Sequence, residues 1–420
     1  MRKTLAICSL AIAAAITAAP AEAVDKTTLR FFTIFDAPAM ESWQPVIDAF
    51  KAANPDIDVK VETVAGSGAA VYPDVLRTSM ASGDPADLFF MWGGEIAGPF
   101  IRAGQVRPVD DYYGRYKWKD RFANWIVARL QKDGKAYGVP YHARGMAFWY
   151  RKDIFDKYGL SDPKSYADLE AICTKLKGAN IYCATFGGKF GWHPMRLLDY
   201  FFETKCGPEV HDKIFSLTAS FDQQCVVDAY ALLKKWVDEK WLVPDFLNVS
   251  PDDSRMPMYQ GNAAMIIEGG WMEDVLKAND QDLKLYDFFL PPTDHQPQRY
   301  PAFPEQWMIT AASKHPDQAA KFIDFITAKD TQVKYPAAFS GTATADVKPD
   351  CATSPHDCKW AEILSSDRQT YGLSDQAYTK ELADIFFEIQ DGVIAGKYAP
   401  ADAAKTMQAK AEAWKAANPR

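Results

Sequence analysis

Along the N-terminal part of the chain, short apolar runs alternate with segments that are apolar on one face only. The first kind has the length and composition of strands, and the second has the spacing of amphipathic helices. Strands are predicted at residues 29–35, 57–61 and 88–91, and helices at residues 41–53 and around residues 75–80. Alternating strands and helices with short connections predict a parallel sheet covered by helices, and therefore an α/β fold.

The middle of the chain contains a long β-rich run from Tyr137 to Tyr150 that is interrupted by Pro140 and Gly145. Interior proline and glycine are unusual in a central strand, and they suit a segment that passes between two domains. A capped helix is predicted to begin after Ser165, because Asp168 follows it at the spacing of a capping box.

Two later stretches each combine a tryptophan with a short apolar run. The run from Gly261 to Trp271 ends in two glycines and the tryptophan, and residues 301–309 contain Trp307 beside prolines and Glu305. Residues 319–326 have helical spacing, and the tail at 380–416 is predicted to be helical. No low-complexity linker divides the sequence, so two domains would be joined by several ordered segments.

The strand at 88–91 is followed directly by Trp92, two glycines and Glu95. Open α/β sheets bind their ligands beyond the carboxyl ends of the strands, and glycines let the backbone approach a ligand closely. A flat apolar ring beside a hydrogen-bond acceptor suits a polyhydroxylated ligand. A buried tryptophan followed by an ordinary turn is the alternative interpretation of the same residues.

The N-terminus has the features of a secretory signal peptide. Arg2 and Lys3 precede an apolar stretch that is too short to span a membrane, and Ala21-Glu22-Ala23 matches a cleavage site. We predict export to the periplasm and cleavage after Ala23, with an uncleaved membrane anchor as the alternative.

The remaining chain of about 400 residues is long enough for two domains with a substantial core. Its net charge is about −9, with both signs interspersed along the sequence. A mildly acidic surface of this kind argues against nucleic acid and anionic membranes as partners.

Six cysteines follow the predicted signal peptide, and none of their spacings is typical of a zinc site. An even number in an oxidising compartment predicts disulfides, although six cysteines allow fifteen connectivities. They lie as near neighbours, which favours the pairs Cys173 with Cys183, Cys206 with Cys225, and Cys351 with Cys358. Free buried thiols are the alternative.

Motifs for the commonest catalytic chemistries are missing from the sequence. It has no zinc-protease helix motif, no nucleotide-binding glycine loop and no nucleophile elbow. Aromatic and polar residues recur instead at predicted strand ends and crossings, which is typical of a recognition site without a nucleophile. We expect no cofactor and no metal.

The chain resembles the extracellular solute-binding proteins of family 1, the sugar-binding receptors of ABC importers in the maltose- and glucose-binding group. The resemblance covers nearly all of residues 25–420 and rests on the order of several short motifs. These are Gly83-Asp-Pro-Ala-Asp-Leu88, Tyr137-Gly-Val-Pro140 with Phe148-Trp-Tyr150, Gly261-Asn-Ala-Ala-Met265 with Gly270-Trp271, and Ser313-Lys-His-Pro316 with Ala319-Ala-Lys-Phe322.

The resemblance implies a two-lobed periplasmic binding protein fold of type II, in which three crossover segments join the lobes and the ligand binds in the cleft between them. Lobe one would comprise residues 24–141 and 304–341. Lobe two would comprise residues 142–303 and 342–420.

On that architecture, the flagged residues converge on one ligand cleft. The implied ligand-binding residues are Asp36, Trp92, Glu95, His142, Arg144, Trp192, Trp271, Glu305 and Trp307. Aromatic rings would stack on sugar rings, while the carboxylates, His142 and Arg144 would bind hydroxyl groups. Two alternatives stay open: a tryptophan such as Trp307 could belong to a core, and Arg144 could be the structural partner of an acid.

The resemblance implies a monomeric protein that binds a mono- or oligosaccharide reversibly and delivers it to the permease subunits of an ABC importer in the inner membrane. An exported glycoside hydrolase is the alternative from another class, and it requires two carboxylates across the cleft. The same fold could also bind a polyol, a polyamine or a metal ion. Aromatic and uncharged strand ends disfavour the metal ion, and a polyamine would require more carboxylates.

Overall fold

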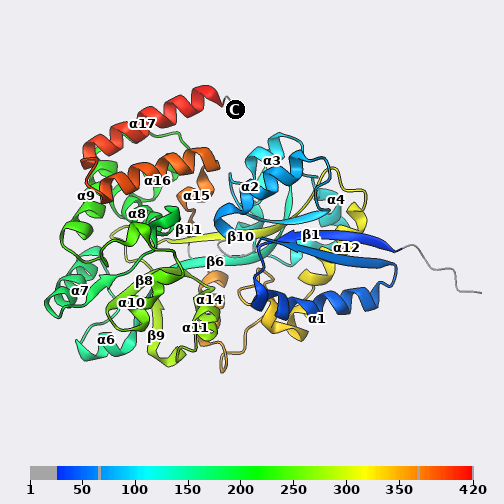
Figure 1. Cartoon of the computed structure of the whole chain (residues 1–420), viewed down its shortest axis with the longest axis horizontal. Helices are drawn as coiled ribbons and strands as arrows, with labels where there is room; N and C mark the ends of the chain where they lie inside the picture. Colours follow the sequence, from blue (N-terminus) through cyan, green and yellow to red (C-terminus); the bar gives the residue numbers. More distant parts are fainter. Residues whose placement is uncertain (1–25, 65–67, 367–368, 419–420) are drawn as a thin grey trace, which may run out of the picture.

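The computed structural model describes residues 26–64, 68–366 and 369–418, so the predicted signal peptide lies outside the described residues. The chain forms two lobes that lie side by side, and two long strands run from one lobe into the other (Figure 1). Within the described ranges, every helix is too short or too polar to cross a bilayer.

The N-terminal elements form the sheet of lobe one. Strand β1 (Thr27–Thr33) pairs in parallel with β2 (Ile57–Thr63) and with β3 (Leu88–Trp92), which confirms the predicted parallel arrangement of these strands. Helices α1 (Ala37–Ala53) and α2 (Gly68–Ala81) connect them. Helix α1 begins four residues before its predicted start, because the Asp36 carboxylate caps it by accepting from Ala39 N at 2.9 Å.

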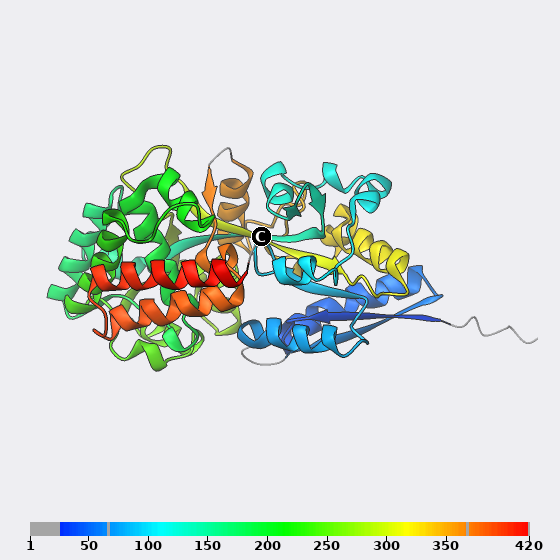
Figure 2. The ribbon, with the colours of Figure 1, turned by 90° about the horizontal axis from the view of Figure 1, so that it is seen from above.

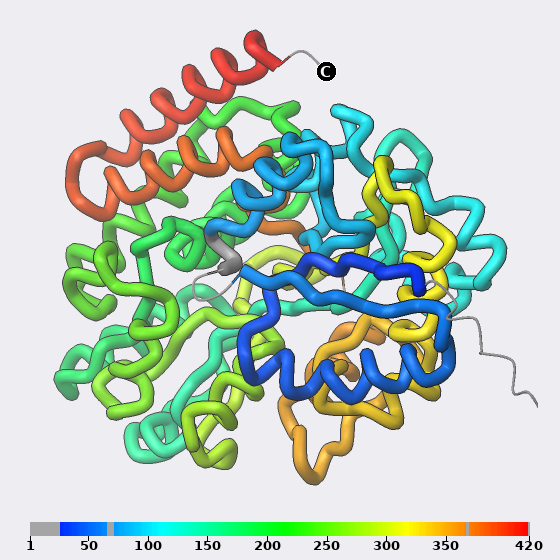
Figure 3. The backbone as a smooth tube through the Cα atoms, turned by 45° about the vertical axis from the view of Figure 1, so that its right-hand side comes forward, coloured from blue at the N-terminus to red at the C-terminus, as the bar shows by residue number. Residues whose placement is uncertain are grey.

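Shorter elements complete lobe one, and several of them, from residue 316 onward, lie much later in the sequence. They are α3 (Gly98–Arg102), α4 (Asp110–Tyr116), α5 (Asn124–Ala128), β4 (Gln131–Lys132), β5 (Lys135–Ala136), α12 (Pro316–Thr327), α13 (Lys329–Lys334), and the 3₁₀ helices at Trp118–Asp120 and Pro336–Ala338. Figure 3 shows the later helices, in yellow, beside the blue N-terminal elements, and α1 contacts α12.

Two crossover strands lie at the centre of the molecule. Strand β6 (Gly138–Arg151) is the segment predicted to pass between domains, and β10 (Tyr300–Ile309) runs antiparallel beside it. The sheet order β2-β1-β3-β10-β6-β8-β7 is therefore mixed rather than wholly parallel. A third crossing follows at residues 340–343, where Thr342 forms a bridge to His142.

Lobe two is rich in helices. Its elements are α6 (Lys152–Lys157), α7 (Tyr166–Gly178), β7 (Tyr182–Ala184), α8 (Trp192–Phe215), α9 (Gln224–Asp238), α10 (Met256–Tyr259), β8 (Ala263–Gly269), α11 (Met272–Ala278), β9 (Tyr286–Phe289), α14 (Pro355–Ser365), β11 (Thr370–Tyr371), α15 (Ser374–Ala377), α16 (Lys380–Ile394), α17 (Pro400–Ala417), and the 3₁₀ helices at Gly188–Phe190, Phe246–Asn248, Asp253–Arg255 and Leu283–Leu285. The predicted capping box of Ser165 and Asp168 starts α7.

The predicted helical tail consists of two helices, α16 and α17. Gly396 adopts a positive φ of 76° just after α16, and Pro400 begins α17, so the chain turns back on itself between them. Figure 2 shows these two helices, in orange and red, packed side by side on lobe two.

Separate cores support the two lobes. One buried cluster is built from residues 29–143 and 307–343, and the others from residues 146–303 and 360–411. The three near-neighbour cysteine pairs are disulfides in the structure, as predicted. All three lie within residues 173–358, on the side of lobe two.

Candidate functional site

Five side chains lie on one side of the strands that cross between the lobes. Glu305 on β10 is directly opposite Trp92 on β3 and opposite His142 on β6. Phe303, two residues earlier, is opposite Arg144. Opposed residues of an antiparallel pair point to the same side, as do residues two apart in one strand. We call Trp92, His142, Arg144, Phe303 and Glu305 the crossover face.

Three members of the crossover face form a buried ionic group. His142 Nδ1 lies 2.6 Å from Glu305 Oε2, and Arg144 Nε lies 3.4 Å from the same oxygen. Burial and the charge of Arg144 lower the pKa of His142 to about 4, so the imidazole is neutral at pH 7. Burial raises the pKa of Glu305, but Arg144 and His142 outweigh this effect and lower it. The carboxylate is therefore ionised, and Arg144 Nη2 also lies 2.7 Å from His142 Nδ1.

The same group reaches the third crossover segment. Arg144 Nη1 donates to the carbonyl oxygen of Ser340 at 3.4 Å, and Ser340 Oγ donates to Asp357 Oδ2 at 2.9 Å. Burial, together with Asp274 and Glu273, raises the pKa of Asp357 to about 6. Arg144 thus links all three segments on which the lobes are joined, in addition to facing the same side as Trp92.

Trp271 lies where β8 ends and α11 begins. Its ring covers Gly269 so closely that a Cβ atom there would lie 2.2 Å from the ring, and only glycine leaves this space. The indole Nε1 donates to Glu268 Oε2 at 3.1 Å, and the ring centroid lies 6.3 Å from that of Phe303. The half-buried ring is therefore held beside the crossover face.

Glu268 is the buried centre of a second ionic group. Its oxygens accept from Arg196 Nη1 at 2.7 Å and from Arg255 Nε at 2.9 Å. Burial raises the pKa of Glu268, but the two guanidinium groups outweigh it and hold the pKa below its usual range. His193 packs against this group as a neutral imidazole, because burial and Arg196 lower its pKa to about 3.

Arg196 lies between two tryptophan rings. Its guanidinium carbon is 4.6 Å from the ring centroid of Trp192 and 5.2 Å from that of Trp271. Trp192 and Arg196 are four residues apart at the start of α8, so they share one face of the helix. Both rings are half-buried. We call Trp192, Arg196 and Trp271 the tryptophan–arginine stack.

Glu95 is not on the crossover face. Its carboxylate is held by Lys132 at 2.6 Å and by a short contact with Arg102. It lines a cavity of about 180 Å³ together with Gln306, and the neighbouring residue Glu305 points to the other side of β10. Its backbone N–H donates to the carbonyl oxygen of Gln376 at 2.6 Å, so Glu95 contributes to contact between the lobes. We therefore leave its side chain out of the candidate site.

Trp307 and Asp36 are also separate from the candidate site. Trp307 has no solvent exposure, and its ring packs in the core of lobe one at 4.4 Å from Tyr141 and 4.8 Å from Phe31. The side of β10 that Trp307 shares with Glu305 is covered at this point by Trp43 of α1. Asp36 is exposed, and its carboxylate caps α1. Neither side chain has a hydrogen bond to the crossover face.

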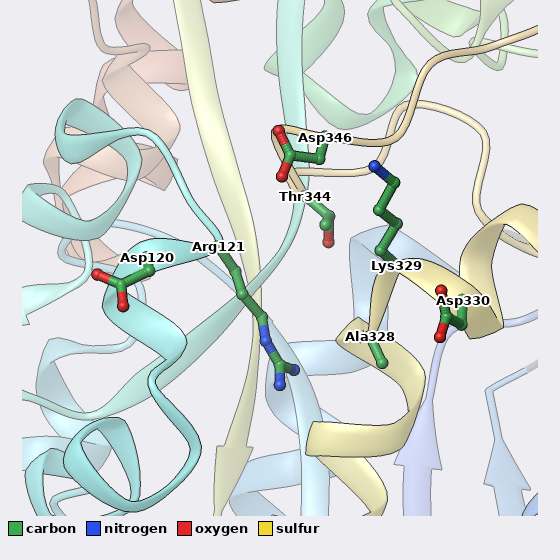
Figure 4. Close-up of a pocket in the computed structure, with 7 residues that line it drawn as sticks. All are labelled: Asp120, Arg121, Ala328, Lys329, Asp330, Thr344 and Asp346. Carbon is green, nitrogen blue, oxygen red and sulfur yellow. The ribbon is translucent and has the colours of Figure 1, made fainter.

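Another cavity lies in a different part of lobe one (Figure 4). It has a volume of about 200 Å³ and is lined by Asp120, Arg121, Ala328, Lys329, Asp330, Thr344 and Asp346. Its carboxylates point in different directions, and the Arg121 guanidinium is already bonded to Asp324 at 2.6 Å. No aromatic ring lines it. Its side chains do not converge on a common point as those of the crossover face do.

Sequence reasoning missed three residues beside the candidate site. Arg196 could have been found from its four-residue spacing to Trp192, and Phe303 from its two-residue spacing to Glu305. Asp375, in α15, had no local signal, because its proximity to Arg196 depends on how α15 packs against α8. Within the described residues, no cluster of histidine, cysteine and acidic side chains has the arrangement of a metal site.

Comparison with known proteins gives one family. The family of bacterial extracellular solute-binding proteins matches residues 36–333. A putative binding protein of Brucella abortus is 25% identical over 88% of this chain and 89% of its own. An uncharacterized ABC transporter extracellular-binding protein of Pyrococcus horikoshii is 25% identical over 70% of this chain, and the match spans 66% of that relative.

Solved structures share the fold. A chitin oligosaccharide binding protein superposes with a TM-score of 0.83 over 93% of this chain and 100% of its own, at 20% sequence identity. At this identity the likeness concerns the fold, and it agrees with the two-lobed architecture described above.

Proposed function

We propose that this chain, which belongs to the bacterial extracellular solute-binding proteins, is the substrate-binding component of an ABC importer for carbohydrates. The observation that carries the proposal is the position of three half-buried tryptophans. Trp92 comes from lobe one, and Trp192 and Trp271 come from lobe two, on either side of the crossover strands. Flat apolar rings beside polar groups suit the apolar faces and the hydroxyl rim of a sugar.

The polar part of the site would come from the crossover face. Glu305 is an ionised acceptor, and Arg144 and the neutral His142 carry N–H donors beside it. A site built from such groups discriminates between sugars, because a missing hydroxyl leaves a buried donor or acceptor without a partner. Arg144 and His142 would act both on the ligand and on the crossovers that they join.

A binding function accounts for Glu305 and Glu268 better than hydrolysis does. A glycosidase needs one carboxyl group that keeps its proton near neutral pH and a second one across the ligand. Glu305 and Glu268 both have lowered pKa values and are bonded to arginine. Neither is suited to donate a proton to a leaving group.

Export and delivery complete the proposal. Residues 1–23 would be a signal peptide cleaved after Ala23, and the protein would act as a monomer in the periplasm. Closure of the lobes on a sugar would be favoured by the contacts that only the closed arrangement makes, and that arrangement would be recognised by the permease subunits. The relative from Pyrococcus horikoshii, described as an ABC transporter binding protein, supports this assignment.

A thermal-shift screen followed by isothermal titration tests the proposal. The panel contains D-glucose, D-galactose, D-xylose, maltose and raffinose, with sorbitol, spermidine and zinc chloride as the competing classes. A bound sugar should raise the melting temperature, since ligands that bind only the native state stabilise it. Recovery of the sugar intact distinguishes binding from hydrolysis. Stabilisation by spermidine or zinc alone, or cleavage of an oligosaccharide, would contradict the proposal.

A further inference from the structure

The short helix α15 connects the two lobes beside the candidate site. Ser374 donates from its backbone N and from Oγ to the Asp199 carboxylate of α8, at 2.8 and 2.5 Å. The backbone N of Asp375 lies 3.2 Å from Met195 Sδ, one residue before Arg196. On the other side, Gln376 O accepts from Glu95 N of lobe one at 2.6 Å. Asp375 therefore lies between α8 and the turn that follows Trp92.

The carboxylate of Asp375 has unused hydrogen-bonding capacity. Its Oδ1 atom is buried and has no hydrogen-bond partner among the described residues. Arg196 is the cation that lowers the pKa of Asp375 most strongly. Its nitrogens nevertheless lie more than 4.0 Å from the carboxylate oxygens, so the two residues do not form an ion pair. A buried carboxylate oxygen without a donor is costly, so a group that supplies one at this place is stabilising.

Arg196 has unused capacity as well. Its Nη1 donates to Glu268 Oε2 at 2.7 Å and to the carbonyl oxygen of Ile267 at 2.9 Å. Its Nη2 and Nε make no hydrogen bond with a described residue, and Arg196 as a whole is only 5% exposed. The guanidinium thus keeps N–H groups that have no partner among the described residues, beside the rings of Trp192 and Trp271.

We propose that Arg196 and Asp375 together bind one hydroxyl group of the ligand and so help to determine which sugar is accepted. The hydroxyl oxygen would accept from an Arg196 N–H, and the hydroxyl proton would be donated to Asp375 Oδ1. This inference rests on the proposed function, because it requires a hydroxylated ligand stacked on the tryptophan–arginine stack.

The paired charges favour a neutral hydroxyl over other ligand groups. A carboxylate or phosphate would be repelled by Asp375, and an ammonium group by Arg196. A hydroxyl donates one hydrogen bond and accepts others, which matches a free acceptor beside a free donor. Asp199, one helical turn further along α8, differs because both its oxygens already accept from Ser374.

The test uses the panel sugar that binds most tightly, its monodeoxy analogues, and the variants Asp375→Ala and Asp375→Asn. Asp391→Asn is the matched control, because Asp391 is also half-buried and burial raises its pKa to about 6, but it lies in α16. Asp375→Ala should bind the sugar about tenfold to a hundredfold more weakly than the parent protein, because it loses a charge-assisted hydrogen bond. Asp391→Asn should bind as the parent protein does.

One monodeoxy analogue should bind the parent protein about as weakly as the full sugar binds Asp375→Ala. When the missing hydroxyl and the Asp375→Ala substitution are combined, their losses of binding free energy should not add. Without ligand, Asp375→Asn should melt at the parent temperature or above it, because an unsatisfied buried charge is removed. Arg196→Lys keeps the charge beside Glu268. It should bind the full sugar more weakly, and removing the same hydroxyl from the sugar should then cause little further loss of affinity.

Three results would overturn the inference. The first is that Asp375→Ala binds the sugar within twofold of the parent protein. The second is that, for every analogue, the losses of binding free energy from the missing hydroxyl and from Asp375→Ala add fully. The third is that Asp375→Asn melts several degrees below Asp391→Asn. If no panel sugar binds the parent protein, the proposed function itself fails, and the inference fails with it. That outcome is distinct, because it appears in the parent protein before any variant is made.

Discussion

The indole N–H of Trp271 donates to Oε2 of Glu268 at 3.1 Å, from a ring that is partly exposed to a carboxylate that is completely buried. The same carboxylate accepts from Arg196, which stacks on the Trp271 ring. Trp271, three residues after Glu268, thus connects a buried ionic group to a partly exposed aromatic ring. The orientation of the ring depends on the buried group beneath it.

Replacing Glu268 by glutamine should destabilise the fold strongly. The change leaves the buried guanidinium group of Arg196 without its counter-charge, and it removes one of the two carboxylates paired with Arg255. Breaking a buried ion pair in this way typically costs about 3–5 kcal/mol of unfolding free energy. Urea denaturation followed by tryptophan fluorescence measures it. The control is Glu239→Gln, which removes an exposed ion pair with Lys177 and should change the unfolding free energy far less. Equal losses of unfolding free energy in both variants would contradict a strong contribution of the buried Glu268 group to stability.

Replacing Trp271 by alanine should weaken sugar binding more than it weakens the fold. An aromatic residue at the centre of a recognition site typically contributes about 2 kcal/mol or more, which is roughly a thirtyfold change in Kd. Isothermal titration with the tightest panel sugar is the measurement. Trp414→Ala removes another half-buried tryptophan that packs on the core of lobe two, far along the sequence in α17, and it should leave the affinity unchanged. Unchanged affinity in Trp271→Ala would remove this ring from the site.

Replacing Gly94 by alanine should disfavour the observed contact between the lobes. Gly94 has φ of 90°, and a Cβ atom there would lie 2.4 Å from the carbonyl oxygen of Gln376. Gly83→Ala is a close control, since Gly83 has φ of 81° and no atom within 4 Å of that position. Both variants should lose about 1 kcal/mol from backbone strain.

Only Gly94→Ala should also open the molecule. Small-angle scattering should then show a larger radius of gyration for Gly94→Ala than for Gly83→Ala without ligand, and its sugar affinity should be lower. Identical scattering and affinity in the two variants would mean that the turn after β3 does not control how the lobes meet.

Glu203 should make stability depend on pH in the acid range. Burial raises its pKa, but hydrogen bonds from Arg299 at 2.7 Å and from His211 at 2.6 Å outweigh this effect and lower it to about 2. A carboxylate whose pKa is lower in the folded state stabilises above its unfolded value, near 4.5, and loses that contribution as pH falls toward 2. The contribution at pH 7 is about 3 kcal/mol at most.

The variant Glu203→Gln isolates this contribution. It should be less stable than the parent protein at pH 7, and the difference in unfolding free energy should shrink between about pH 4.5 and pH 2. Urea titrations at several pH values measure it. A difference that stays constant over this range would mean that Glu203 is not the group responsible.

The sequence alone determined the α/β class, the parallel pairing of the first strands and most element types. These follow from local periodicity: the apolar run at Leu88–Trp92 and the capping box at Ser165 need no distant partner. The near-neighbour disulfides were predictable for the same reason, because short loops bring their cysteines together. Alternation also made it possible to predict that His142 and Arg144 face one side.

Only the tertiary structure decided which of the flagged residues come together. Glu95 and Trp307 lie close in sequence to Trp92 and Glu305, yet the first is bonded to Lys132 and the second is covered by α1. Side-chain direction follows a local period, but burial and ionic partners depend on elements that pack from elsewhere in the chain. The proximity of Arg196 to Asp375 is the clearest case, since it arises only where α15 packs against α8.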